Sequence, residues 1–226
     1  MTTFRLGLSH DGYTALPAGA RPVGRVLKRL LDLAVAATLL LLCLPLLLVV
    51  WAVVRVTSPG PALFRQSRVG QGGRPFHVLK FRTMVVDGDD TQHREYVRRL
   101  LTGSAEPQDG LYKLGADPRV TRAGAVLRKT SIDELPQLFN VLRGEMSLVG
   151  PRPALPWEAR MFPAWAASRF SVRPGLTGLW QVSGRNRLTM LDGLVLDVDY
   201  VSRHNVFLDL YILVRTVPAV LNGGAR

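Results

Sequence analysis

Residues 33–54 read LAVAATLLLLCLPLLLVVWAVV, a run of 22 residues without a charged side chain. At ~1.5 Å per residue, a straight helix of this length is about 33 Å long, enough to cross the hydrocarbon core of a bilayer. A secretory signal peptide has an apolar core of only about 7–15 residues, followed by a small-residue cleavage site. This run is longer and ends at Arg55, so it predicts a membrane segment that the protein retains.

The topology of this run depends on its middle and its flanks. Pro45 removes one backbone hydrogen bond near the centre, so it predicts a kink there. Basic flanks prefer the cytoplasmic side, and both flanks are basic, which a re-entrant hairpin satisfies. An ordinary spanning helix that tolerates Pro stays equally open. The basic residues before and after the run are Arg21, Arg25, Lys28, Arg29, Arg55, Arg65, Arg68, Arg74, Lys80 and Arg82.

The composition of the whole chain narrows the class of protein. Its 226 residues suit one domain, or one domain with an anchor. The apolar fraction of 47% excludes a wholly disordered or collagen-like chain, and the single Cys excludes a disulfide framework or a Cys-rich zinc site. Lys and Arg total 29 against 17 Asp and Glu, and the resulting charge of +12 favours anionic partners.

Three regions follow one another along the chain. Residues 1–24 contain several Gly and Pro and predict a loop-like leader, residues 25–57 hold the membrane segment, and residues 58–226 form one cytoplasmic domain. The fold class is therefore mostly α with a small β-hairpin, an α+β domain. The elements expected within it include two short strands at 62–68 and 76–83 and a helix at 91–101.

Residues 130–144 read TSIDELPQLFNVLRG and carry both a helix start and a helix stop. Ser131 and Glu134 fit the S-x-x-E capping box, and Gly144 fits the end of the helix. Asp133 and Glu134 would then lie at the positive end of the helix dipole, which stabilises carboxylates and attracts phosphate. Two interpretations stay open: the acids are helix caps only, or they are reactive groups.

Arginine beside proline or glycine recurs around this acidic pair. Pro and Gly fix the backbone that aims a side chain, and the planar guanidinium binds phosphate oxygens in a bidentate manner. The pattern predicts carboxylates ringed by rigidly mounted cations, a constellation for phosphoryl chemistry. The stretches concerned are Arg128-Lys129, Pro151-Arg152-Pro153, Arg173-Pro174-Gly175 and Gly184-Arg185-Asn186-Arg187.

Taken together, these stretches resemble the bacterial sugar transferases, the monotopic polyprenol-phosphate sugar-1-phosphate transferases or phosphoglycosyl transferases. The resemblance covers roughly residues 28–226, and its motifs occur in the family's order. They are KRxxD at 28–32, KFRTM at 80–84, SIDELPQ at 131–137, SLVGPRP at 147–153, and RPGLTG at 173–178 with QVSGRN at 181–186.

The resemblance implies transfer of a sugar 1-phosphate from a nucleotide-diphosphate sugar, by default a UDP-sugar, to undecaprenyl (polyprenol) phosphate. This is the first membrane step of polysaccharide or glycoconjugate synthesis, exopolysaccharide included. Asp133 would be the nucleophile that forms a covalent phosphosugar intermediate and would hold Mg²⁺, and Glu134 would act as a base or support the metal. The residues implied to contact substrate phosphates are Lys80, Arg82, Arg128, Arg152, Arg173 and Arg185.

The same resemblance implies a location and partners. The membrane segment would be a re-entrant hairpin bent at Pro45, where Leu44 stands in place of the Ser that the family often has. The catalytic domain would lie on the cytoplasmic face of the bacterial inner membrane, in contact with lipids. The oligomeric state stays open, a homodimer included.

For two further helical segments, the sequence leaves open whether they pack against the domain or lie at the membrane interface. Trp157, Met161 and Trp165 recur at a spacing of four residues, and either an interfacial helix or a stripe that faces the core explains them. Residues 206–221 are apolar and contain Asp209, so they predict a packed or interfacial helix rather than a spanning one.

Two other classes of function were weighed against the transferase. The charge of +12 admits a membrane-anchored nucleic-acid-binding protein, but the chain has no zinc-finger spacing, basic helix or RNA-binding signature, so we expect no nucleic-acid partner. An inactive scaffold would not need the intact pair of Asp133 and Glu134 with its arginine motifs.

Overall fold

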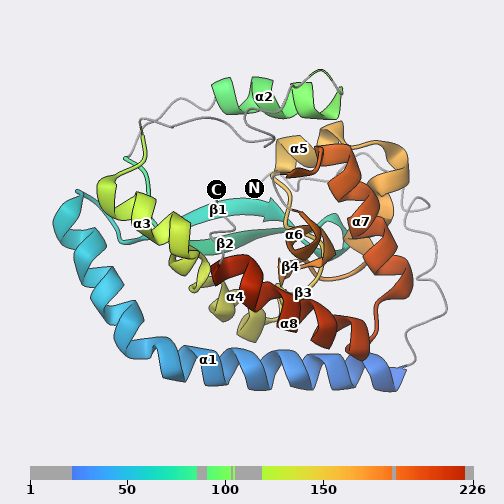
Figure 1. Cartoon of the computed structure of the whole chain (residues 1–226), viewed down its shortest axis with the longest axis horizontal. Helices are drawn as coiled ribbons and strands as arrows, with labels where there is room; N and C mark the ends of the chain where they lie inside the picture. The colour runs from blue at the N-terminus through green and yellow to red at the C-terminus, as the bar shows by residue number, and fades with distance from the viewer. Residues whose placement is uncertain (1–21, 86–90, 103, 105–118, 185–186, 222–226) are drawn as a thin grey trace.

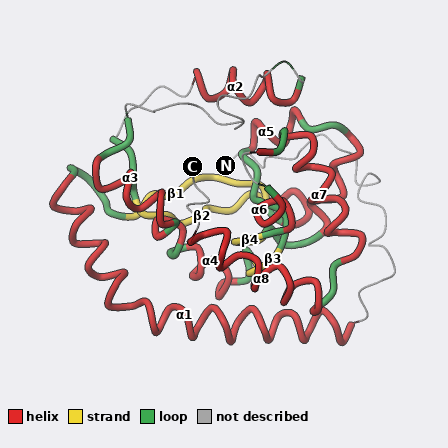
Figure 2. Tube along the Cα trace, viewed as in Figure 1, coloured by secondary structure: helices red, strands yellow, loops and turns green. Residues whose placement is uncertain are grey.

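The computed structural model describes residues 22–85, 91–102, 104, 119–184 and 187–221, and helices dominate this part of the chain (Figure 2). The helices are α1 (Pro22–Thr57), α2 (Thr91–Leu101), α3 (Arg122–Thr130), α4 (Gln137–Arg143), α5 (Pro156–Met161), α6 (Leu179–Ser183), α7 (Met190–Arg203) and α8 (Val206–Leu221). Short 3₁₀ turns are η2 (Gln71–Gly73), η3 (Ile132–Glu134) and η4 (Ala164–Ser171). The predicted mostly helical α+β class is confirmed.

Two small sheets lie among these helices. The expected hairpin is formed by β1 (Leu63–Val69) and β2 (Pro75–Phe81), which pair antiparallel from Leu63 opposite Phe81 to Val69 opposite Pro75. A second sheet, which the sequence did not predict, pairs β3 (Ser147–Val149) in parallel with β4 (Gly175–Thr177). Strands of three residues have too few side chains to show an alternating pattern.

Helix α1 is long, bent and mostly exposed. Figure 1 shows one arm running beneath the domain and a second arm turning up along its side. Pro45 lies inside the helix, as the predicted kink requires. Within the described part of the chain, α1 alone is long and apolar enough to cross a membrane, and only 22% of its most apolar window is buried. A core helix of a soluble protein would be mostly buried, so α1 indicates membrane association.

Two polar side chains tie the first arm of α1 to the domain. Lys28 Nζ pairs with Asp209 Oδ2 of α8 at 2.7 Å. Asp32 Oδ1 accepts hydrogen bonds from Ser147 Oγ at 3.1 Å and from the backbone N–H of Leu148 at 3.0 Å. Because the Asp32 contacts are buried and the Lys28 pair is part-buried, and all are specific, they fix the register between α1, α8 and strand β3.

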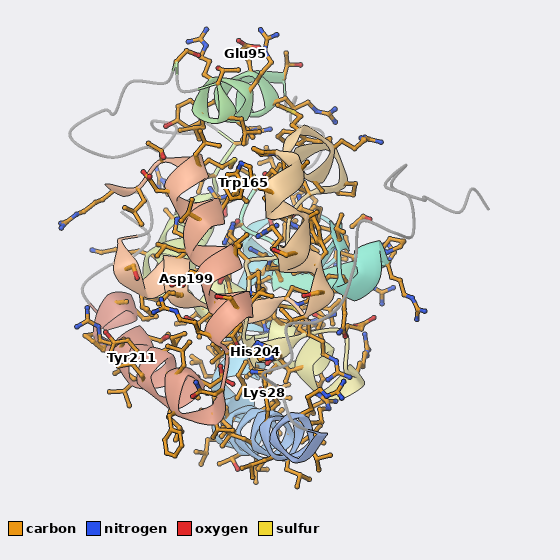
Figure 3. All side chains as sticks on the ribbon, turned by 90° about the vertical axis from the view of Figure 1, so that its right-hand side faces the viewer. Lys28, Glu95, Trp165, Asp199, His204 and Tyr211 are labelled. Carbon is orange, nitrogen blue, oxygen red and sulfur yellow. The ribbon has the colours of Figure 1, made fainter. Side chains whose placement is uncertain are left out.

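The two open interpretations of the tryptophan stripe both assumed one helix, and that assumption is wrong. Helix α5 ends at Met161, and Phe162 is extended, with φ of −68° and ψ of 142°. Pro163 follows it, and the residue before a proline is pushed out of the helical region. Trp165 belongs to the separate turn η4, and in Figure 3 it lies well above Lys28 of α1.

Helix α8 packs one side against the core and exposes apolar side chains on the other. Asp209 and Ile212 are fully buried against the core, whereas Phe207 is 83% exposed and Val214 71% exposed. The helix also contacts α1, and both lie at the lower side of Figure 1. The exposed apolar side chains of α8 therefore belong to a helix that contacts α1.

Candidate active site

The backbone turn that leads to Asp133 and Glu134 is made at Ser131, a residue in the left-handed region. Ser131 has φ of 57°, the only positive φ of a non-glycine residue among those that the structure describes. It closes α3, with its backbone N–H donating to Arg128 O at 3.2 Å, and η3 begins directly after it. Asp133 and Glu134 thus lie in a tight turn ahead of α4, and Gly144 ends that helix in the predicted left-handed conformation.

The predicted capping box between Ser131 and Glu134 is wrong. The Ser131 side chain makes no capping hydrogen bond, because the left-handed backbone makes this residue the end of α3 rather than the start of α4. Glu134 Oε1 instead accepts a hydrogen bond from Lys80 Nζ of β2 at 2.8 Å. The structure therefore brings together residues from two of the motifs, 54 positions apart.

A narrow pocket lies next to this ion pair, with about 270 Å³ of space that is partly open to solvent. Its cationic residues outnumber its acidic ones, so the pocket favours an anion. The polar side chains that line it are Arg68, Lys80, Glu134, Gln137, Arg152 and Gln181.

Asp133 lies beside Glu134 and is 8% exposed. Burial raises the pKa of its carboxyl from 3.8 to about 6, and the charge of Glu134 adds to this rise. The nearby Lys80 and Arg128 lower the pKa, but burial prevails. A carboxylate in this setting is poorly solvated, which makes it more reactive and marks a candidate functional group.

Burial also lowers the pKa of the Lys80 ammonium, against the opposing effect of Glu134. For Arg68, burial and the nearby Arg152 lower the pKa to about 10. The carboxylates of Glu134 and Glu158 oppose this shift. Arg152 lowers the pKa of both cations through its charge, and this repulsion indicates a pocket that favours an anion.

The second sheet builds the opposite wall of this pocket. Parallel pairing of β3 with β4 places Pro151-Arg152-Pro153 beside Arg173-Pro174-Gly175, with Gly175 N donating to Pro151 O at 2.9 Å. The strands approach so closely that a Cβ on Gly175 would lie 2.1 Å from Gly150 N. Arg152 is exposed at the rim, on the rigid backbone that the sequence predicted.

The other predicted phosphate contacts do not all line the pocket. Arg82 is buried and its Nη2 donates to Ser58 O at 2.8 Å and to Gly60 O at 3.2 Å, after the end of α1. Arg173 is exposed and lies close enough to Arg29 for the two charges to repel. Arg185 lies outside the described residues.

Three residues of the pocket carried no role in the sequence interpretation. Arg68 of β1 is buried and donates from Nη1 to Pro153 O at 2.9 Å. Gln137 and Gln181 are also buried, and the Oε1 atom of Gln181 has no hydrogen-bond partner among the described residues. Gln137 and Gln181 belong to the SIDELPQ and QVSGRN motifs but are uncharged, and Arg68 lies outside the motifs, so only tertiary packing shows that the three line one pocket.

A magnesium ion suits the donor set of Asp133 and Glu134. Mg²⁺ is usually held by one or two carboxylates, with waters and substrate phosphates completing its shell. No group of three or more His, Cys, Asp or Glu side chains gathers in the described part of the chain. The two carboxylates fit a metal that shares its shell with a substrate, and do not fit a closed structural metal site.

Comparison with known proteins agrees with the resemblance that the sequence motifs show. The family model described as bacterial sugar transferase matches residues 23–223. The exopolysaccharide production protein ExoY of Rhizobium meliloti is 44% identical over 200 residues, 88% of each chain. The UDP-glucose:undecaprenyl-phosphate glucose-1-phosphate transferase of Caulobacter vibrioides is 45% identical over 96% of this chain and 78% of its own. The undecaprenyl-phosphate galactose phosphotransferase of Salmonella typhimurium is 38% identical over 89% of this chain and 42% of its own.

Proposed function

Because the chain belongs to the bacterial sugar transferase family, we propose that it transfers a sugar 1-phosphate from a UDP-sugar to undecaprenyl phosphate, with Asp133 as the nucleophile. Membership makes the chain an enzyme of the phosphoglycosyl transferase class. The names of the Caulobacter and Salmonella relatives support this donor and acceptor. The observation that carries the proposal is the buried Asp133 carboxylate, with its raised pKa, beside a pocket rich in cations.

The proposed reaction has two displacements at one phosphorus atom. An oxygen of Asp133 attacks the phosphorus that carries the sugar, the bond to the bridging oxygen breaks, and UMP leaves with the electron pair. The sugar phosphate then remains on Asp133 as an acyl phosphate. An oxygen of undecaprenyl phosphate attacks the same phosphorus, which frees the carboxylate and yields the undecaprenyl-diphosphate sugar.

Cations on the chain make these displacements feasible. A carboxylate attacks an anionic diphosphate poorly unless the negative charge is neutralised. Lys80 lines the pocket beside Asp133 and Arg152 stands at its rim, so both are proposed to hold the diphosphate oxygens. Glu134 holds Lys80 in place through the 2.8 Å hydrogen bond.

Magnesium is proposed as the cofactor, held by Asp133 with support from Glu134. When bound, Mg²⁺ supplies positive charge to the diphosphate oxygens. The raised pKa of Asp133 is consistent with such a site, because a group destabilised by burial gains from a bound cation.

The membrane segment is proposed to enter and leave on the cytoplasmic face of the inner membrane. Its bend, its exposed apolar side chains and its two basic flanks support this topology. Single cysteines introduced at residues 2 and 226, in a Cys43→Ser background, test it with a membrane-impermeant thiol reagent. Both should be protected in intact cells, and labelling of one end alone would indicate a spanning helix.

The reaction is tested with purified full-length protein in nanodiscs, a panel of UDP-sugars, Mg²⁺ and undecaprenyl phosphate. We expect release of UMP that requires the metal and falls at least about 10³-fold in Asp133→Asn. Asp199→Asn, an acid on the outside of α7, is the matched control and should retain activity.

Mass spectrometry examines the intermediate directly. Quenched wild-type protein, incubated with donor and no acceptor, should carry the mass of a sugar phosphate on the peptide that contains Asp133. Undiminished turnover in Asp133→Asn, or turnover without any adduct, would remove the proposed nucleophile.

A further inference from the structure

The segment that carries Arg152 is held through its carbonyl groups. Pro151 and Pro153 have no backbone N–H, so the carbonyls provide most of its hydrogen bonds. Pro151 O accepts from Gly175 N at 2.9 Å, and Pro153 O accepts from Arg68 Nη1 at 2.9 Å. Arg152 O accepts from Arg169 Nη2 at 2.7 Å.

The donor to Arg152 is itself deeply buried. Arg169 of η4 is 3% exposed, and its guanidinium packs over the rings of Phe162 and Phe170 at 5.0 and 5.3 Å from their centres. A buried guanidinium is costly unless a carboxylate and further acceptors satisfy it. Asp197 of α7, with no exposed surface, provides the carboxylate: its Oδ2 accepts from Nη2 at 2.5 Å and from Nε at 3.1 Å.

Asp197 is also influenced by Arg152 itself. Burial raises the pKa of Asp197, and the charge of Arg169 opposes this most strongly. The charge and the backbone N–H of Arg152 oppose it as well, although no hydrogen bond of good geometry reaches Oδ1. The ion pair therefore holds, through Arg169, the C=O of the residue that presents its side chain at the pocket rim.

We infer that Arg169 and Asp197 are positioning residues, which fix the backbone of Arg152 so that its guanidinium meets the phosphates of the donor. The inference rests on the proposed role of Arg152 as a phosphate contact. Neither member of the pair lines the pocket beside Lys80 and Glu134, and although Arg169 borders a second small hollow with Arg152, the pair is 3% and 0% exposed. The pair therefore acts through Arg152 rather than on the substrate. A flexible Arg152 would have to be ordered on each binding event, which weakens donor binding.

The test is Arg169→Lys in the full-length protein, assayed with the UDP-sugar of the panel that the wild type turns over fastest. Lysine keeps the charge beside Asp197, but its single ammonium does not reproduce the fork that reaches both Asp197 and Arg152 O. We expect KM for the donor to rise about tenfold with kcat within about twofold, because the diphosphate is held in the ground state as well as in the transition state.

A double variant separates positioning from simple loss of structure. In an Arg152→Ala background, Arg169→Lys should raise KM no further, since the side chain that it positions is absent. An equal increase in both backgrounds would overturn the inference and leave the proposed function intact. A normal donor KM in Arg152→Ala would instead remove the phosphate role, and the inference with it.

Val201→Ala is the matched control for stability. Val201 lies on α7, like Asp197, and is 2% exposed in the core. Its truncation lowers the melting temperature through a cavity, and the donor KM should stay at the wild-type value. A rise in KM that follows the loss of melting temperature in both Val201→Ala and Arg169→Lys would show that the pair is only structural.

Discussion

Two sets of buried carboxylates can be compared in the described part of the chain. Asp32 and Asp209, at the contact between α1 and the domain, are 2% and 1% exposed, and each accepts hydrogen bonds from two donors. Asp209 accepts hydrogen bonds from Lys28 and from the Tyr200 hydroxyl, both at 2.7 Å. Asp133, at 8% exposed, receives no hydrogen bond or ion pair from another side chain within the described ranges.

The comparison shows how a fold tolerates buried charge in two ways. A partnered carboxylate is stabilised by its donors and orders the elements that supply them. A carboxylate that is buried among charges without a direct partner stays at a cost in stability, and this cost is typical of functional sites. The first kind fixes α1 to the domain, and the second is the candidate nucleophile.

The largest loss of stability is expected when Asp209, a carboxylate of the partnered set, is removed. Asp209→Ala leaves the Lys28 ammonium without its carboxylate and leaves the Tyr200 hydroxyl with Val149 O, at 3.1 Å, in place of its closer acceptor. The free energy of unfolding should fall by about 3–5 kcal/mol, as measured by denaturant unfolding in detergent micelles.

A compensating pair sharpens this test. The double variant Lys28→Met with Asp209→Leu should recover most of the loss, since apolar side chains of similar volume replace a buried pair at little cost. Leu210→Ala, on the outer side of the same helix at 43% exposed, is the control and should change little. A wild-type stability in Asp209→Ala would contradict the structural role given to the partnered set.

Substitution of Asp133 is expected to raise the stability of the protein, in contrast to Asp209→Ala. Its pKa rises from 3.8 to about 6 on folding, so its contribution to stability is fully present below pH 3.8 and is lost as the pH rises through 6. Asp133→Asn removes the charge and should stabilise the protein by about 2–3 kcal/mol at pH 8. Asp32→Asn should instead destabilise it, because the hydrogen bonds from Ser147 and Leu148 are weaker to an amide oxygen than to a carboxylate.

Melting temperatures of Asp133→Asn at two pH values check the cause of this gain. The gain should shrink between pH 8 and pH 5, since the wild-type carboxyl takes up its proton in that interval. A gain that is the same at both pH values would show that it has a different origin from the buried charge.

The raised pKa of Asp133 also predicts the pH dependence of turnover. The nucleophile must be ionised, so kcat/KM for the donor should fall about tenfold per pH unit below about 6. Arg128 lowers this pKa through its charge, and Arg128→Gln should move the inflection to higher pH. A flat profile from pH 5 to pH 8, in protein shown to remain folded, would contradict the assignment.

Much of the fold could be predicted because its signals are local. The apolar run, the hairpin at 62–68 and 76–83 and the helix at 91–101 each carry their pattern within a short window, and the structure places α1, β1–β2 and α2 there. The parallel pairing of β3 with β4 joins residues 28 positions apart, and strands of three residues give no periodic pattern from which to infer it.

The sequence predicted those residues of the candidate site that are charged members of a motif. Asp133, Glu134, Lys80 and Arg152 come from such motifs, and they lie at or beside the pocket. Arg68 is one of two arginines in strand β1, and its contact with Pro153 follows from tertiary packing alone.

Ser131 shows how a strong local pattern can fail. S-x-x-E is the sequence of a capping box, but the end of α3 meets the start of η3 at this residue, and the backbone there is left-handed. The constraint comes from two consecutive helical elements rather than from one, so a window centred on either helix misses it.

The smallest change in stability is expected from substitution of Ser131. A left-handed backbone costs an L-residue about 1–2 kcal/mol, and glycine avoids that cost, although it loses more chain entropy on folding. Ser131→Gly should therefore raise the free energy of unfolding by no more than about 1 kcal/mol, or roughly 2–4 °C in melting temperature, with unchanged turnover. Ser131→Val should lower both stability and turnover, because a β-branched side chain disfavours this backbone and would displace Asp133 from Lys80. Equal turnover in the two variants would show that the left-handed turn does not position the nucleophile, and that burial of Asp133 suffices.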